Sequence, residues 1–143
     1  QFLLAVERHP RGLIEVQLDA NFNQLVWQKN HILDETSFNL IKDRATDLTG
    51  LYFHKDNIYG LFRNAELIIQ WVKDEEGHFK EANSWSYAHV VNAPENQYKD
   101  MEFGHAEGLA VDDNYFYVVI DNNQSAKAKQ LSDTRPFLIV INR

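Results

Sequence analysis

A segment of this chain occurs twice, and the duplication limits the folds that the chain can adopt. Residues 47–59 read DLTGLYFHKDNIY and residues 105–117 read HAEGLAVDDNYFY. Gly50 and Gly108 are 58 positions apart, and the two segments align at that spacing without a gap. Self-similarity at a fixed spacing is typical of repeat proteins, in which each copy forms one supersecondary unit.

Each copy predicts a β-hairpin, because an apolar run is followed by a polar turn and a second apolar run. Similar runs flank the two copies. The expected strands are Phe2–Val6, Leu13–Leu18, Asn23–Trp27, Leu48–His54, Asn57–Phe62, Glu66–Lys73, Glu81–Val90, Ala106–Asp112, Tyr115–Asp121 and Phe137–Asn142. Between the third and fourth strands, Asp34 or Ser37 is expected to cap one or two helical turns in a connection that ends near residue 43.

This pattern predicts an all-β fold, a fragment of a β-propeller with about two and a half four-stranded antiparallel blades. With strands named A to D from the channel outward, the chain supplies B, C and D, then a whole blade, then A, B and C. The blades span about residues 1–30, 46–91 and 104–143 of one domain, 1–143. We expect a six-bladed propeller whose remaining blades lie upstream in the same protein.

Composition narrows the classes of partner. The formal net charge is −7, and the 14 Lys and Arg residues are scattered, which argues against a nucleic-acid surface. There is no cysteine, so disulfides, thiolate zinc sites and a thiol nucleophile are excluded. No apolar run approaches the roughly 20 residues that span a bilayer.

Meander topology predicts where the polar residues of these blades meet. The start of strand A and the turn between strands B and C lie at the same end of a blade, so these positions converge at the channel mouth. The expected ligand-binding residues are Glu7, Arg8, Asp47, Thr49, Arg63, Asn64 and His105. The expected metal ligands are Glu107, Asp121 and Asn122, because carboxylate and amide oxygens suit Ca²⁺.

Structural roles compete with these assignments. Glu107 could pair with an arginine of a neighbouring blade, and His105 could serve as a hydrogen-bonded structural residue. Asp121 and Asn122 could cap a turn through their own backbone. The long segment from Gln124 to Arg135 could act as a lid or an anion contact, or be a mobile loop with solvated charges.

Three stretches resemble the SdiA-regulated family of bacterial β-propellers and, more distantly, phytase-like or esterase-like propellers. They are residues 6–11 (VERHPR), residues 47–51 (DLTGL), and residues 106–112 (AEGLAVD) with 117–123 (YVVIDNN). One difference is that the family usually carries a glutamate where this chain has Asp121. The resemblance implies an extracytoplasmic protein, periplasmic or extracellular, with a site at the channel mouth and no firmly assigned reaction.

Two functions are compatible with these observations. The first is a module that binds a small-molecule or protein ligand over the channel mouth, with Ca²⁺ as a structural or bridging ion. The second is a metal-dependent hydrolase of phosphoesters or lactones, in which Glu107 with Asp121 or Asn122 would hold Ca²⁺ and activate water. No nucleophile and base pair is evident in the sequence, so whether the protein is an enzyme stays open.

Overall fold

The computed structural model describes residues 1–38, 46–101 and 105–143, and it is all-β with three antiparallel sheets. Sheet one consists of β1 (Phe2–Val6), β2 (Gly12–Leu18) and β3 (Leu25–Ile32). Sheet two consists of β4 (Leu48–His54), β5 (Asn57–Phe62), β6 (Leu67–Lys73) and β7 (Phe79–Ser86). Sheet three consists of β8 (Ala106–Val111), β9 (Tyr115–Ile120) and β10 (Phe137–Asn142).

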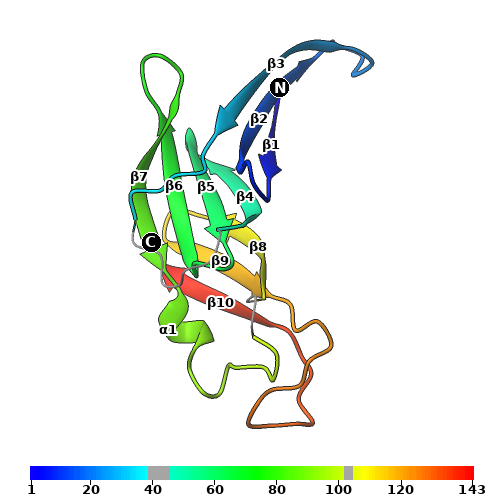
Figure 1. Cartoon of the computed structure of the whole chain (residues 1–143), viewed down its shortest axis with the longest axis vertical. Coiled ribbons are helices and arrows are strands. Elements are labelled where there is room, and N and C mark those ends of the chain that lie inside the picture. Colours follow the sequence, from blue (N-terminus) through cyan, green and yellow to red (C-terminus); the bar gives the residue numbers. More distant parts are fainter. Residues whose placement is uncertain (39–45, 102–104) are drawn as a thin grey trace.

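The three sheets follow one another along the long axis of the molecule (Figure 1). In each sheet the strands pair in chain order, and no sheet closes on itself. Such a meander forms because a polar turn returns the chain beside the strand that it has just made. These turns are short except for the β9–β10 connection, residues 121–136. The predicted order of three, four and three strands is confirmed, and a propeller formed from them is considered below as a proposal.

Sequence and structure agree on the repeat at the level of single residue pairs. Leu51 pairs with Gly60 in sheet two, and Leu109 pairs with Val118 in sheet three, each residue shifted by 58 positions. Both sheets carry a β-bulge at the same place, at Thr49 and at its counterpart Glu107. The two copies therefore share strand pairing, register and a local irregularity.

Two apolar layers hold the sheets together. The layer between sheets one and two is built around Leu13, Leu48, Ile58, Phe62, Ile69 and Trp71. The layer between sheets two and three is built around Tyr59, Leu61, Ile68, Phe116, Val118, Ile120 and Ile139. Tyr59 and Trp71 are almost fully buried, as expected for aromatic residues that pack sheet against sheet.

Three predicted elements differ from the structure by more than one residue, and four further predicted strands differ by a single residue at one end. The third strand runs over Leu25–Ile32 rather than Asn23–Trp27. It begins later because the Asp19 side chain accepts hydrogen bonds from the backbone N–H groups of Asn23 and Gln24 and keeps them in the turn. It ends later because its pairing with β2 continues as far as Ile32, which lies opposite Gly12. The strand predicted to reach Val90 ends at Ser86. A four-residue helix, α1 (Ala88–Val91), follows it.

The third difference concerns the connection after sheet one. Asp34 accepts a hydrogen bond of 2.6 Å from the backbone N–H of Arg11, so its side chain ties two loops together rather than capping a helix. Residues 39–43 of the predicted helical turns lie outside the described residues, as does residue 104, the predicted first residue of the last blade. Among the described residues, no helix has the length and apolar character needed to cross a membrane.

Candidate functional site

The candidate site is the side of the stack where one end of each sheet's strands comes together. The β1–β2 turn, the start of β4, the β5–β6 turn, the start of β8 and the end of β9 meet there. We call this surface the rim. The backbone N–H of Leu48 donates to the carbonyl of Glu7 at 3.1 Å, which joins sheet one to sheet two. The hydroxyl of Thr49 donates to the carbonyl of Ala106 at 2.8 Å, which joins sheet two to sheet three. The predicted convergence of these segments is therefore present.

Arg63 lies at the centre of the rim and pairs with carboxylates from all three sheets. Its Nε and Nη2 donate to Oδ2 of Asp47 at 2.9 and 2.6 Å, and its Nη2 also donates to Oε1 of Glu7 at 3.2 Å. Its Nη1 donates to Oε1 of Glu107. One guanidinium thus bridges the three sheets, an arrangement for which the planar fork of arginine is well suited.

Burial and charge at this cluster are uneven. Asp47 is 4% exposed, and its Oδ1 accepts a 2.9 Å hydrogen bond from the backbone N–H of Asn64. The side chains of Glu7 and Glu107 are 44% and 39% exposed. Burial alone would lower the pKa of Arg63, but its pairing with Glu107 and Asp47 outweighs burial and raises that pKa. Arg63 therefore stays protonated, and its guanidinium contacts three carboxylate side chains.

The structural alternative for Glu107 matches the structure, since its carboxylate pairs with Arg63 of the neighbouring sheet. Arg8 lies beside the cluster, with its Nε 3.5 Å from Oε1 of Glu7 and its side chain 80% exposed. Glu7, Asp47, Arg63 and Glu107 are brought together as predicted. Thr49 lies at the same rim but donates to a backbone carbonyl.

His105 is buried and engaged on both ring nitrogens. Its Nε2 contacts the carbonyl of Asp100, and its Nδ1 lies 3.3 Å from the side-chain amide nitrogen of Asn123. The Tyr98 ring packs against it with centroids 5.4 Å apart. These contacts fit the second of the two roles considered for His105, that of a hydrogen-bonded structural residue.

The other two predicted metal ligands are engaged in turn formation. The backbone N–H of Asp121 donates to the carbonyl of His105, and its Oδ1 accepts from the backbone N–H of Asn123 at 3.2 Å. The side-chain amide of Asn122 donates to the carbonyls of Ser125, at 3.0 Å, and Thr134. Asn122 is 7% exposed and faces its own loop, so it closes the segment that follows β9.

The segment from Gln124 to Arg135 is held by one buried lysine, Lys127, whereas its other two basic residues, Lys129 and Arg135, are exposed to solvent as the sequence allowed. Lys127 is 8% exposed, with its Nζ 3.8 Å from the centre of the Phe137 ring and donating to the carbonyl of Asn96 at 2.9 Å. Its desolvation lowers the pKa of the ammonium group. Arg135 pairs with Asp133 at 2.9 Å. The segment is tied to the connection between α1 and β8, and its buried lysine cannot contact an anion in solution.

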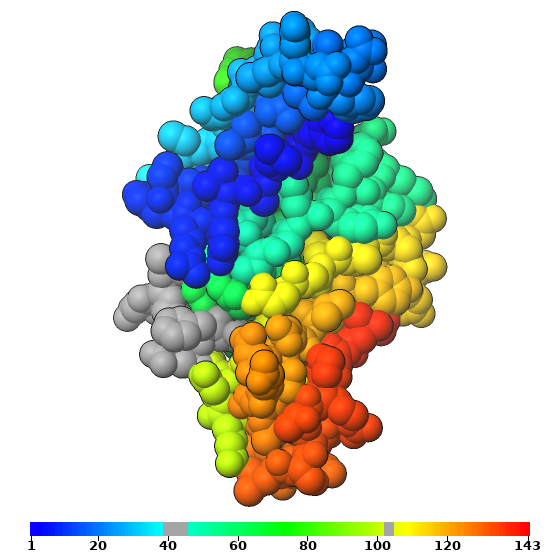
Figure 2. Space-filling view, turned by 90° about the vertical axis from the view of Figure 1, so that its right-hand side faces the viewer, coloured from blue at the N-terminus to red at the C-terminus, as the bar shows by residue number. Residues whose placement is uncertain are grey.

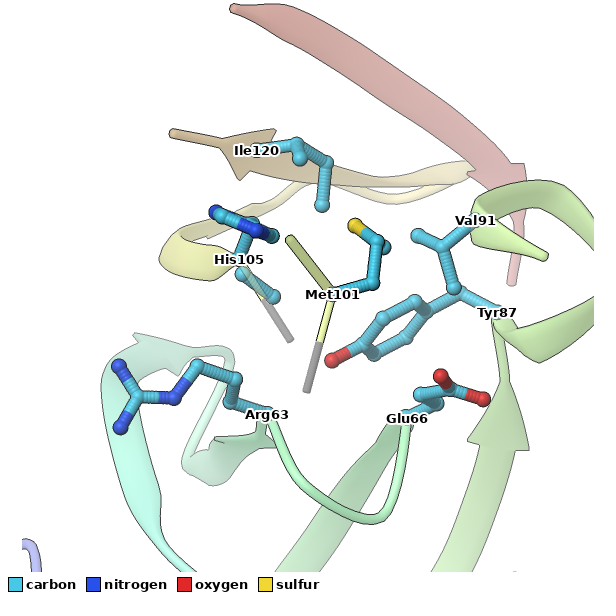
Figure 3. Close-up of a pocket in the computed structure, with 8 residues that line it drawn as sticks. Arg63, Glu66, Tyr87, Val91, Met101, His105 and Ile120 are labelled. Atoms are coloured by element: carbon cyan, nitrogen blue, oxygen red, sulfur yellow. The ribbon is translucent and has the colours of Figure 1, made fainter. Parts of the chain in front are cut away.

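A shallow pocket lies beneath the rim, between sheets two and three. It encloses about 210 Å³, part of it open to solvent, and is lined by Arg63, Glu66, Tyr87, Val91, Met101, His105, Ala106 and Ile120. Figure 3 shows the Arg63 side chain pointing away from it, while the Tyr87 ring reaches into it. The Tyr87 hydroxyl donates to the carbonyl of Phe62 at 3.1 Å. The part of it that the centre of a water-sized molecule can reach is only about 10 Å³, roughly enough for one water molecule, so this pocket is too small for a drug-sized ligand.

Sequence reasoning missed a charged cluster that joins sheets one and two away from the rim. Glu15 is 6% exposed, its Oε2 lies 2.8 Å from Nε2 of His31, and its Oε1 pairs with Nζ of Lys73. Side chains two residues apart on a strand share a face, so Glu15 lies on the same face of β2 as the apolar Leu13. This alternation was the signal in the sequence that Glu15 would be buried and would need partners. This cluster fastens the two sheets and contributes no group to the rim.

No group of three or more His, Cys, Asp or Glu side chains that could hold a metal ion occurs in residues 1–38, 46–101 and 105–143. Comparisons with protein-family models, with curated proteins and with solved structures found no match. The resemblance to the SdiA-regulated propellers therefore remains a prediction that depends on the sequence motifs alone.

Proposed function

We propose that this chain forms part of an extracytoplasmic β-propeller that binds a ligand or partner at the rim. The observation that supports this function is the convergence of Glu7, Asp47 and Glu107 on Arg63, each carboxylate coming from a different sheet or turn. Residues contributed by several units of a repeat are a common way to build a binding surface on a rigid scaffold.

The charges at the rim favour a ligand that carries a positive charge. Arg63 and the exposed Arg8 balance two of the three carboxylates, so an excess of one negative charge is left. Asp47 is enclosed and committed to Arg63 and to the backbone of Asn64. The half-exposed carboxylates of Glu7 and Glu107 are therefore the groups that an incoming cation would meet first.

Ca²⁺ fits this rim as a bridging ion rather than as an ion held by the protein alone. Calcium takes about six to eight oxygen ligands, and the rim offers two half-exposed carboxylates. The remaining ligands would come from water or from the bound partner. In this role Glu7 and Glu107 would hold the ion, while Asn122 would not, because its amide is bonded within its own loop.

Calorimetric titration of the purified protein with CaCl₂ tests this proposal. The wild-type protein is expected to bind Ca²⁺, and Glu107→Gln is expected to weaken binding by about tenfold, since a carboxylate ligand is replaced by a neutral amide. Glu75→Gln is the matched control, because Glu75 is an exposed carboxylate in the β6–β7 turn, at the other end of sheet two. Equal affinity in the wild type and Glu107→Gln would rule out calcium at the rim.

The hydrolase alternative stays a prediction. It requires metal-dependent turnover of aryl phosphates, aryl esters or lactones that Glu107→Gln abolishes. Turnover that persists in Glu107→Gln would mean that Glu107 does not hold the catalytic ion, whereas binding without turnover would favour the binding module.

A further inference from the structure

The two junctions between sheets are built in the same way. In each one, the face that a sheet turns toward the following sheet packs on the face that the following sheet turns back toward it. In sheet two, Ile58 and Phe62 belong to the apolar layer toward sheet one, while Tyr59 and Leu61 belong to the layer toward sheet three. In sheet three, Phe116 and Ile120 are the counterparts of Ile58 and Phe62, 58 positions later, and they face sheet two. Each sheet thus presents one face to the sheet before it and the opposite face to the sheet after it.

The face that sheet three would present to a following sheet is uncovered. Leu61 is fully buried, whereas its counterpart Val119 is 47% exposed. In the strand register Val119 lies beside Leu138 and Tyr117 lies beside Val140. Leu138 and Val140 are 55% and 52% exposed. These four residues, Tyr117, Val119, Leu138 and Val140, form the outer face of sheet three.

Sheet one also has an uncovered face, the one that it would present to a preceding sheet. Leu13 is fully buried in the layer toward sheet two, so residues of alternate position point to the other side. There Phe2 pairs with Val16 and Leu4 pairs with Ile14 in the strand register. Phe2 and Leu4 are 43% and 50% exposed. These four residues, Phe2, Leu4, Ile14 and Val16, form the outer face of sheet one.

The two outer faces lie at opposite ends of the stack, as the succession of colours along the molecule shows (Figure 2). They carry no charged side chain. Exposed apolar surfaces of this kind mark sites where a partner docks. Each junction inside the chain joins a face turned toward the following sheet with a face turned toward the preceding sheet. The outer face of sheet three is of the first kind and the outer face of sheet one is of the second kind, so the two are complementary in type.

We propose that a second copy of this chain docks here, with the outer face of sheet one in one copy packed on the outer face of sheet three in the other. The chain itself carries both halves of such a junction, which is the reason to prefer a second copy over an unrelated partner. The upstream blades expected from the sequence are the competing occupant of these faces, and a protein that stays monomeric would favour them. The contact is head to tail. If two copies contact each other reciprocally, six sheets close into a ring, and a two-fold rotation about the ring axis keeps both rims on the same side.

Analytical ultracentrifugation of the purified protein tests this proposal. The wild type is expected to have twice the mass of one chain, or a higher multiple if the contacts propagate without closing. Val119→Asp and Leu4→Asp are each expected to give monomers, since a carboxylate would be buried at the junction. Leu131→Asp is the matched control, because Leu131 is 62% exposed in the segment between β9 and β10 and lies on neither outer face.

A mixture of the two variants distinguishes this arrangement from a symmetric contact. Val119→Asp retains an intact sheet one face and Leu4→Asp retains an intact sheet three face, so the mixture is expected to regain one junction and form a dimer. Circular dichroism checks folding, and Leu138→Asp replaces Val119→Asp if the latter unfolds. A wild-type protein that is monomeric at every concentration, or a dimer that survives both Val119→Asp and Leu138→Asp, would overturn the proposal. This outcome is independent of calcium binding at the rim.

Discussion

Substitution of Gly60 by alanine is expected to destabilise the fold, although Gly60 is not one of the repeated glycines. Gly60 lies in β5 with the ring of Trp71 packed against its backbone. A Cβ atom there would lie 2.5 Å from Cη2 of Trp71 and 2.8 Å from Cδ1 of Leu48. Trp71 is 1% exposed and packs against Phe62, so its ring has little room to move.

The size of the effect follows from two opposing contributions. Overpacking of a well-filled core costs about 1 to 3 kcal/mol. Removal of a glycine from a strand returns about 0.5 to 1 kcal/mol of conformational entropy. With the middle of each range, about 2 kcal/mol of cost and about 0.75 kcal/mol of gain, the free energy of unfolding should fall by about 1.3 kcal/mol. For a urea m-value near 2 kcal/mol/M, the unfolding midpoint would fall by roughly 0.5 to 1 M.

Gly108→Ala is the matched control. A Cβ atom at Gly108 would lie 3.4 Å from Cβ of Val119, an ordinary van der Waals contact, so this substitution should leave stability within about 0.5 kcal/mol of the wild type. Urea unfolding followed by tryptophan fluorescence measures both variants. Equal midpoints for the wild type and Gly60→Ala, or a larger loss in Gly108→Ala, would refute the proposed packing of Trp71 on Gly60.

Three further predictions concern the polar contacts. Arg63→Ala should lower the free energy of unfolding by about 2 to 3 kcal/mol, because it leaves the buried carboxylate of Asp47 without its ion-pair partner. Arg8→Ala is the control and should change that free energy by less than about 0.5 kcal/mol, because Arg8 is exposed. Urea unfolding measures both variants, and similar losses in the two would contradict this prediction. Burial raises the pKa of Glu15, but hydrogen bonds from its lysine and histidine partners outweigh burial and lower that pKa. The stabilising contribution of Glu15 is therefore present above its unfolded pKa of about 4.3 and is lost as the pH falls. The difference in the free energy of unfolding between the wild type and Glu15→Gln should shrink in acid. A difference that is constant with pH would argue against the charged cluster around Glu15. Asn122→Ala removes two hydrogen bonds to loop carbonyls, and limited proteolysis should cut residues 123–135 faster than in the wild type; unchanged cleavage would mean that other contacts hold the loop.

The repeat is the feature that the sequence predicted most completely. Alternating apolar residues and polar turns are local signals, so the ten strands could be placed from the sequence, with errors mainly at their ends. The two copies, 58 positions apart, also have equal strand registers in the structure, which were not predicted from the sequence. The shared β-bulge at Thr49 and Glu107 was not predicted, because a bulge depends on how two strands pair rather than on one residue type.

The candidate site was predictable as a location but not as a set of contacts. Meander topology alone placed the turns and strand starts of all three sheets at one rim. It could not show that Asn122 faces its own loop or that Lys127 is enclosed by aromatic rings, because those outcomes depend on which side chains fill the space nearby. The helix after β7 was missed for the same reason, since the burial of Tyr87 is decided by residues from other elements.

The sequence by itself determined the strands, their order and the repetition of one unit, since these depend on residues close together along the chain. Only the tertiary structure decided which charges meet. Arg63 contacts Glu107 and Glu7, which are 44 and 56 residues away, and no local pattern encodes such a pairing. The pairing arises because the packing of apolar faces sets where the three sheets lie relative to one another, and this places the charged groups of all three sheets within reach of one another.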